Sequence, residues 1–228
     1  MKLPAWDKLP EKMKNEKVRP YYDVLQKKGK SLFFKRMFDI AVSFLLLIIL
    51  FPICLIVAVW IKIDSPGSIL FQQVRVTQFG REFRIYKFRT MVENAEMLGS
   101  QVTTSQDMRV TKAGRFLRKY RLDEFPQLLN IFIGDMSFVG TRPEVPRYVK
   151  QYTDEMYATL LLPAGVTSQA SIMYKDEEQL LASVANPNDT YVQMILPKKM
   201  KFNLDDLKKF SMFNEFKTMI QTVKAVLA

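Results

Sequence analysis

Two adjacent carboxylates, Asp123 and Glu124, lie among cations in the middle of the chain, directly after Arg118, Lys119 and Arg121. Aspartate is a covalent nucleophile toward phosphoryl groups, and Mg²⁺ binds through one or two carboxylates together with substrate phosphates. Nearby cations keep such carboxylates ionised and neutralise charge on a transferring group. The stretch therefore indicates a site that handles phosphate and a divalent metal. The alternative is a surface acid pair in ordinary salt bridges.

A second compact stretch follows at residues 134–143, where Arg142 stands between Thr141 and Pro143. The chain contains neither G-x-G-x-x-G nor G-x-x-x-x-G-K, which excludes the usual Gly-rich phosphate loops. A nucleotide would have to be held by arginines and backbone turns. Arg142 is the best candidate for that contact, and a simple structural turn is the alternative.

Composition narrows the chemistry that this chain can perform. None of the 228 residues is histidine, and Cys54 is the single cysteine. Ser-His-Asp and Cys-His nucleophile systems, His-ligated zinc and a disulfide framework are therefore excluded. Because Cys54 lies in the most apolar stretch, a cysteine metal site is excluded too, and a reducing compartment is indicated. Catalysis must rest on carboxylates, lysines, arginines or hydroxyls.

The positive charge of the chain is concentrated in two blocks. The net charge is 34 − 23 = +11. Residues 1–36 carry eleven Lys/Arg against four Asp/Glu, and residues 62–121 carry twelve against five, so each block has a net charge of +7. Such blocks fit an anionic membrane surface, phosphorylated substrates or nucleic acid. A solvated charged surface is the alternative.

Residues 40–61 form an uncharged apolar run of 22 residues, long enough to cross a bilayer. Pro52 lies within the run and removes a backbone hydrogen bond, which predicts a kinked or broken helix. Lysines and arginines flank the run on both sides, so a single span conflicts with the positive-inside tendency. A re-entrant segment that returns to the same side satisfies it. The residues alone leave both topologies open.

Periodicity and turn residues predict the elements that must position the acids. Residues 1–34, rich in lysine and broken by prolines, are expected to form an interfacial or partly disordered arm, and they do not resemble a secretory signal. Residues 69–76 and 81–89 alternate around Gly80 and predict a β-hairpin. A helix from 115 to 120 leads into the acid pair and restarts after Pro126, with four apolar residues on its buried side: Leu128, Leu129, Ile131 and Phe132.

The remaining segments give weaker signals. A short helical piece is expected at residues 93–98. Residues 144–185 are predicted to be helical with interruptions at Pro146 and at 163–165. Residues 186–189 are predicted to form a turn. From 191 to 228 the apolar residues have helical spacing, which favours packing helices with exposed lysines and aspartates.

Seven short segments, in order, resemble the small monotopic phosphoglycosyl transferases, a family of bacterial sugar transferases. They are residues 35–39, 71–75, 87–91, 107–111, 122–127, 134–137 and 139–143. The resemblance extends over residues 35–228. It implies a helix-rich α/β fold, in which a membrane re-entrant helix-break-helix precedes a cytoplasmic catalytic domain with a small β-hairpin.

The resemblance also implies the domain organisation and location. Residues 1–34 would be the basic interfacial arm, 35–63 the re-entrant membrane helix broken at Pro52, and 64–228 the cytoplasmic catalytic domain. The protein would be inserted monotopically at the cytoplasmic face of the bacterial inner membrane, in contact with its lipid. Nucleic acid is not an implied partner, and a homo-oligomer is left open.

The implied reaction transfers a sugar 1-phosphate from a UDP-sugar to polyprenol phosphate and releases UMP, as the first membrane step of surface-glycan synthesis. Asp123 would be the nucleophile that forms a phosphosugar-enzyme intermediate, and Glu124 would bind Mg²⁺. Arg142 and Pro143 would contact the nucleotide. Four cations would hold phosphates: Lys87, Arg89, Arg118 and Arg142.

The chain departs from the family pattern at three places. Phe51 stands before Pro52 where serine is frequent, Thr141 replaces the first proline of a Pro-Arg-Pro turn, and Ser168 ends the usual Pro-Gly-x-Thr-Gly segment. These departures keep open an inactive family member. The alternative from another class is a membrane-tethered basic protein that binds anionic lipid or nucleic acid without catalysis. Binding alone needs the cations but not Asp123.

Overall fold

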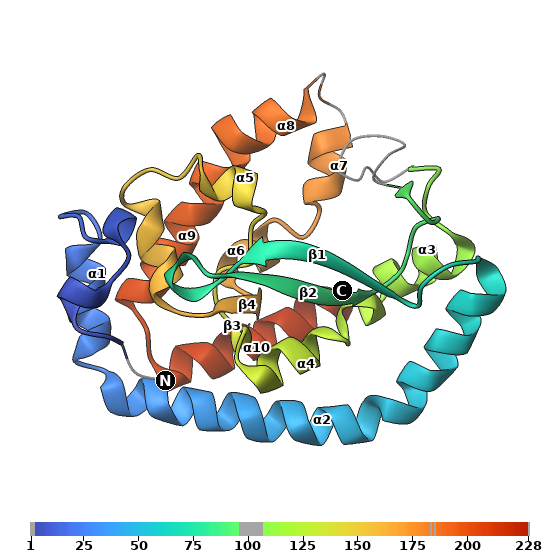
Figure 1. Cartoon of the computed structure of the whole chain (residues 1–228), viewed down its shortest axis with the longest axis horizontal. Coiled ribbons are helices and arrows are strands. Elements are labelled where there is room, and N and C mark those ends of the chain that lie inside the picture. Colours follow the sequence, from blue (N-terminus) through green and yellow to red (C-terminus); the bar gives the residue numbers. More distant parts are fainter. Residues whose placement is uncertain (1–2, 96–106, 183, 185, 228) are drawn as a thin grey trace.

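One long helix, α2 (Gly29–Asp64), runs along the edge of the molecule, and the strands and other helices lie to one side of it (Figure 1). The computed structural model describes residues 3–95, 107–182, 184 and 186–227. The expected helical piece at 93–98 falls largely outside these residues. Among them, α2 is the one helix whose length and composition would allow it to cross a membrane.

The segment α2 remains helical through Pro52. The prediction that Pro52 interrupts the helix is therefore wrong. Figure 1 shows instead that α2 bends in its second half, as a proline inside a helix favours. One face of the helix is exposed along its length. Large apolar side chains on that face include Phe44, Ile48, Phe51, Ile56 and Val59.

Charged residues near the start of α2 attach it to β3 (Met136–Val139) and α10 (Met212–Leu227). The buried Lys35 Nζ donates to the Val139 carbonyl (2.9 Å) and to Glu215. The Asp39 carboxylate accepts from the Ser137 hydroxyl at 2.8 Å. Each of these charges is buried with a partner, as buried charges must be.

The predicted hairpin is confirmed. Strand β1 (Leu70–Val76) pairs antiparallel with β2 (Glu82–Phe88), and a short 3-10 turn joins them, η3 (Gln78–Gly80). Phe79 and Gly80 both have positive φ, 59° and 74°, which closes the turn tightly. The pairing places Lys87 opposite Phe71.

The helical segment around the acids is also confirmed, with an earlier start. It comprises α3 (Lys112–Lys119), a 3-10 turn η5 (Leu122–Glu124) and α4 (Gln127–Ile133), with the restart after Pro126 as predicted. Leu128 and Ile131 are buried. The expectation for Leu129 and Phe132 is wrong, because both side chains are exposed. They lie outside the face of α4 that packs against the hairpin.

The side chain of Asn130 joins α4 to the edge of the hairpin. Its Oδ1 accepts from the Tyr86 backbone N–H (3.0 Å), and its Nδ2 donates to the Arg84 carbonyl (2.8 Å). The amide thus makes the two hydrogen bonds that a neighbouring strand would make. This contact sets the distance between β2, which carries Lys87, and the helix that follows the acid pair.

A parallel strand pair was not predicted. Strand β3 (Met136–Val139) pairs with β4 (Ala164–Thr167), so the expectation of helix over 144–185 is wrong at β4. The remainder of that segment is helical in short pieces: α5 (Pro146–Val149), η6 (Met156–Leu161), α6 (Gln169–Met173) and α7 (Glu177–Ala182). Just beyond β3, Gly140 lies against Gly165 of β4. A Cβ on Gly165 would lie 2.1 Å from the Gly140 nitrogen.

The C-terminal segment is helical, as predicted. It contains α8 (Pro187–Thr190), one π-helical turn η7 (Tyr191–Ile195), α9 (Leu196–Lys208) and α10 (Met212–Leu227). The predicted turn at 186–189 is instead the start of α8, where the Asn186 side chain accepts from the Asp189 N–H. Such side-chain caps are typical of helix N-termini.

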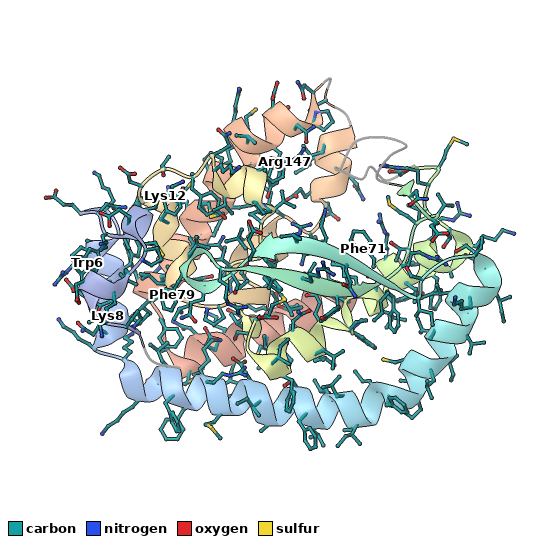
Figure 2. All side chains as sticks on the ribbon, in the orientation of Figure 1. Trp6, Lys8, Lys12, Phe71, Phe79 and Arg147 are labelled. Carbon is teal, nitrogen blue, oxygen red and sulfur yellow. The ribbon has the colours of Figure 1, made fainter. Side chains whose placement is uncertain are left out.

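The N-terminal arm is folded in its described part. It contains η1 (Trp6–Lys8), η2 (Glu11–Met13) and α1 (Arg19–Gln26). It lies beside α9, and Figure 2 shows Phe79 of the hairpin turn near Trp6 and Lys8. Its apolar residues share one core with η6 and α9: Leu9, Met13, Val18, Tyr21, Tyr22 and Leu25. The expectation of partial disorder is therefore wrong here, and the interfacial location stays a prediction.

Candidate active site

The predicted site residues line one cavity of about 680 Å³, a volume within the usual range for ligand pockets. They arrive from separate elements: β2, α3, η5 and the loop after β3. In Figure 2, Phe71 of β1 and Arg147 of α5 mark two sides of this cavity. The structure thus brings together Lys87, Arg89, Arg118, Asp123, Glu124, Arg142 and Pro143.

Glu124 holds two of the predicted phosphate-binding cations. Its Oε1 accepts from Lys87 Nζ at 2.9 Å and from Arg142 Nη2 at 2.7 Å. Burial alone would raise the pKa of the Glu124 carboxyl, but Arg142 and Lys87 together hold it well below its usual range. Burial lowers the pKa of Lys87, against the attraction of Glu124. The acid pair is therefore not a surface pair in ordinary salt bridges.

Asp123 has the opposite electrostatic environment. Its carboxylate is 7% exposed, and burial raises its pKa, with Lys87 opposing the shift and Glu124 adding to it. Two neighbouring carboxylates whose pKa values are pushed apart are typical of residues with different catalytic roles. Arg121, two residues earlier, has left-handed φ (56°), a conformation uncommon outside glycine that often marks functional sites.

Two other predicted phosphate ligands differ in their surroundings. Arg118 Nε donates to the Thr90 hydroxyl at 2.9 Å, on the wall of the cavity. Arg89 is buried, and its guanidinium donates to the carbonyls of Ser65 and Pro66, both at 2.7 Å. These contacts tie β2 to the end of α2. We therefore assign Arg89 a positioning role, and its phosphate contact stays a prediction.

The turn that carries Arg142 is held by its backbone on two sides. The Gly165 N–H donates to the Thr141 carbonyl at 2.8 Å. From β1, Arg75 Nη1 donates to the Pro143 carbonyl at 3.0 Å, and the Val76 N–H donates to the Glu144 carbonyl at 2.9 Å. The close approach of Gly140 and Gly165 thus helps to place the Arg142 guanidinium against the Glu124 carboxylate.

The donor set at the acid pair fits Mg²⁺. Asp123 and Glu124 supply hard carboxylate oxygens in a cavity lined by cations, and Mg²⁺ is commonly held by one or two carboxylates plus substrate phosphates. Among the described residues, no cluster of three or more acidic, cysteine or histidine side chains forms a protein-only metal site.

Sequence reasoning missed one wall of the cavity. Among the described lining residues, ten Lys/Arg stand against six Asp/Glu, a difference of +4. Several lining residues come from segments in which no site residue was predicted: Glu144, Tyr148, Glu177, Tyr191 and Lys199. Lys199 belongs to a helix whose lysines were expected to be exposed, yet it is 5% exposed. Helical spacing cannot distinguish a buried lysine from a solvated one.

A family profile described as bacterial sugar transferase matches residues 30–228. The chain is 35% identical over 199 residues to the UDP-N-acetylgalactosamine-undecaprenyl-phosphate N-acetylgalactosaminephosphotransferase of Aeromonas hydrophila, covering 86% of this chain and 44% of that protein. It is 32% identical over 218 residues to the UDP-glucose:undecaprenyl-phosphate glucose-1-phosphate transferase of Escherichia coli K12, covering 93% and 44%.

A shorter relative matches over most of its own length. The protein named uncharacterized sugar transferase EpsL of Bacillus subtilis (strain 168) is 33% identical over 198 residues, which cover 85% of this chain and 87% of that protein. The chain thus spans less than half of the first two relatives and most of the third. Residues 30–228, which the family profile matches, contain every predicted site residue.

Proposed function

Because this chain belongs to the bacterial sugar transferase family, we propose that it transfers a sugar 1-phosphate from a UDP-sugar to polyprenol phosphate and releases UMP. Two relatives whose names state undecaprenyl phosphate as acceptor support undecaprenyl phosphate as the polyprenol. The sugars in those two names differ, so the donor sugar is a matter for experiment. We place the reaction at the first membrane step of surface-glycan assembly.

The proposed reaction has two displacements at one phosphorus atom. An Asp123 carboxylate oxygen attacks the phosphorus that bears the sugar, and the bond to the UMP oxygen breaks. The product is an acyl phosphate between Asp123 and the sugar. A polyprenol phosphate oxygen then attacks the same phosphorus, and the aspartate leaves as a carboxylate. Each step forms one P–O bond and breaks one, so no oxidant or reductant is needed.

The observation that carries this proposal is the sharing of Glu124 by Lys87 and Arg142 beside the buried Asp123. A binding protein would need the cations alone, whereas this cavity also buries a carboxylate next to them. Burying a carboxylate costs free energy, and a protein that only bound anions would gain nothing from that cost. The non-catalytic alternative is therefore not favoured.

Mg²⁺ is proposed as the cofactor, held by Glu124 and the donor diphosphate. When bound, it would neutralise charge on the transferring phosphate and on the leaving UMP. Lys87 and Arg142 hold the Glu124 carboxylate ionised, which keeps it available as a ligand. Arg118 and Arg142 orient the diphosphate, with Pro143 beside the nucleotide.

Monotopic insertion of α2, with both of its ends on one side of the bilayer, is supported by the arm. Residues before α2 and residues after it share one core, through contacts such as the hydrogen bond from the Tyr21 hydroxyl to Glu155 (2.6 Å). A helix that crossed the bilayer would place these partners on opposite sides. Phe44 stacks on Phe132 of α4 with ring centres 5.9 Å apart, so the apolar face of α2 continues onto that helix.

Cysteine labelling tests this topology. In a Cys54→Ala background, Pro20→Cys and Lys150→Cys place exposed thiols before and after α2. A membrane-impermeant reagent is expected to label both in inverted membrane vesicles and neither in intact cells. Labelling of the two positions from opposite sides would refute the monotopic arrangement.

The decisive test of the reaction is UMP release by detergent-purified protein with Mg²⁺, undecaprenyl phosphate and a panel of UDP-sugars. Repeated turnover is expected with at least one sugar and is expected to stop when EDTA is added. When the lipid is omitted, release is expected to end after about one UMP per enzyme, because the intermediate then has no acceptor. The active member of the panel would name the donor. Protein that is folded by thermal unfolding and releases UMP from no donor would contradict the proposal.

A further inference from the structure

A buried polar network joins α9 to the turn that carries Arg142. The Tyr191 hydroxyl donates to Glu144, and Lys199 Nζ donates to the Tyr191 oxygen at 3.1 Å and to Glu177 at 2.8 Å. Lys199 Nζ also lies 3.9 Å from the Glu144 carboxylate. We name these four residues the α9 network.

We propose that Tyr191 and Lys199 are positioning residues for the nucleotide diphosphate, acting through the turn at Arg142. This inference rests on the proposed function, because it assigns Arg142 to the donor phosphates. All four residues of the α9 network line the same cavity as the acid pair. The network therefore reaches the wall of the site.

The α9 network holds the Glu144 side chain of a turn whose contacts from Gly165, Arg75 and Val76 reach its backbone carbonyls. Glu144 is 6% exposed and follows Arg142 by two residues. Its carboxylate is fixed by Tyr191, while its carbonyl is fixed by β1. A shift of Glu144 would carry Arg142 with it and lengthen the 2.7 Å contact with Glu124.

The charges of the network depend on one another. Glu144 and Glu177 are two carboxylates on one cavity wall, and Lys199 is the cation between them. Without that ammonium, the two like charges would face each other beside the donor diphosphate, which is itself anionic. The buried network thus keeps acidic side chains from repelling the ligand. Buried ion pairs are seldom the most stable choice, so their presence at a ligand wall indicates a role in orientation.

Binding of UDP, the part that all proposed donors share, tests the inference. Calorimetry with the full-length protein in detergent is expected to show about tenfold weaker UDP binding for Tyr191→Phe, because small displacements of a contacting group have large effects. Tyr157→Phe is the matched control. It removes a buried hydroxyl of the same core, which donates to the Val149 carbonyl at 3.3 Å away from the cavity. The control is expected to stay within about twofold of wild type.

A double-mutant cycle separates positioning from general destabilisation. If Tyr191 acts through Arg142, Tyr191→Phe should weaken UDP binding no further once Arg142→Ala is present, because coupled residues are not additive. Equal effects of Tyr191→Phe and Tyr157→Phe would overturn the inference. So would a full Tyr191→Phe effect in the Arg142→Ala protein. Wild-type protein that binds no UDP would instead contradict the proposed function, and this inference with it.

Discussion

Asp123→Asn is expected to reduce UMP release by at least about 10³-fold, because it removes the proposed nucleophile while keeping the size of the side chain. Binding of UDP is expected to change by less than about threefold, since the cations that hold the diphosphate remain. Mass spectrometry should detect a phosphosugar adduct on wild-type protein mixed with donor alone. The variant should show no adduct.

The control for this prediction is Asp135→Asn. Asp135 is also a mostly buried aspartate paired with a cation, and it accepts from Arg81 Nη2 at 2.6 Å, but it does not line the cavity. Its replacement is expected to leave UMP release within about twofold of wild type. Turnover retained by Asp123→Asn would exclude the covalent route. Loss of turnover in both variants would point to a fold effect.

Gly165→Ala is expected to be the most destabilising of these substitutions. The added Cβ would lie 2.1 Å from the Gly140 nitrogen and 2.3 Å from its oxygen, so the two backbones must separate. That separation breaks the hydrogen bonds from Gly140 N–H to Thr167 (2.9 Å) and from Gly165 N–H to Thr141 (2.8 Å). We expect a loss of roughly 3 kcal/mol or more in the free energy of unfolding, or roughly 6–12 °C in Tm.

Gly29→Ala is the matched control, because its Cβ would meet no atom within 4 Å at the start of α2. Thermal unfolding in detergent should show a Tm that is not below that of wild type and lies up to roughly 4 °C above it, since alanine favours a helix over glycine by roughly 1 kcal/mol. Calorimetry should also show weaker UDP binding for Gly165→Ala, because its strand holds the turn that carries Arg142. A wild-type Tm for Gly165→Ala would contradict the close packing of the two glycines.

Local patterns predicted the elements around the acid pair. Alternation with Gly80 identified the hairpin, and Pro126 identified the restart of the helix, because both signals arise within a few residues. The grouping of Lys87, Asp123 and Arg142 was different in kind. It came from the family resemblance, since no spacing along the chain relates a strand, a 3-10 turn and a loop.

Elements that depend on distant partners could not be predicted. Strands β3 and β4 have four residues each, too few for periodicity, and they pair because Gly140 and Gly165 allow two backbones to approach. The burial of Lys199 depends on Glu177 and Tyr191, which lie on other elements. The structure of the arm could not be predicted for the same reason. Its prolines and lysines indicate a loosely structured segment, because the sequence of the arm does not show that it packs beside α9.

The position of the arm has a consequence for biosynthesis. Ribosomes make residues 3–28 before α2, yet the residues that bury the arm include Glu155 and Phe210, which are made much later. In the proposed monotopic arrangement, the arm must therefore remain on the cytoplasmic side without these partners while α2 reaches the lipid and the rest of the chain emerges. Contacts so distant along the chain form slowly. Completion of this core would be the last folding event. It could occur only if α2 had inserted with both of its ends on the same side of the membrane.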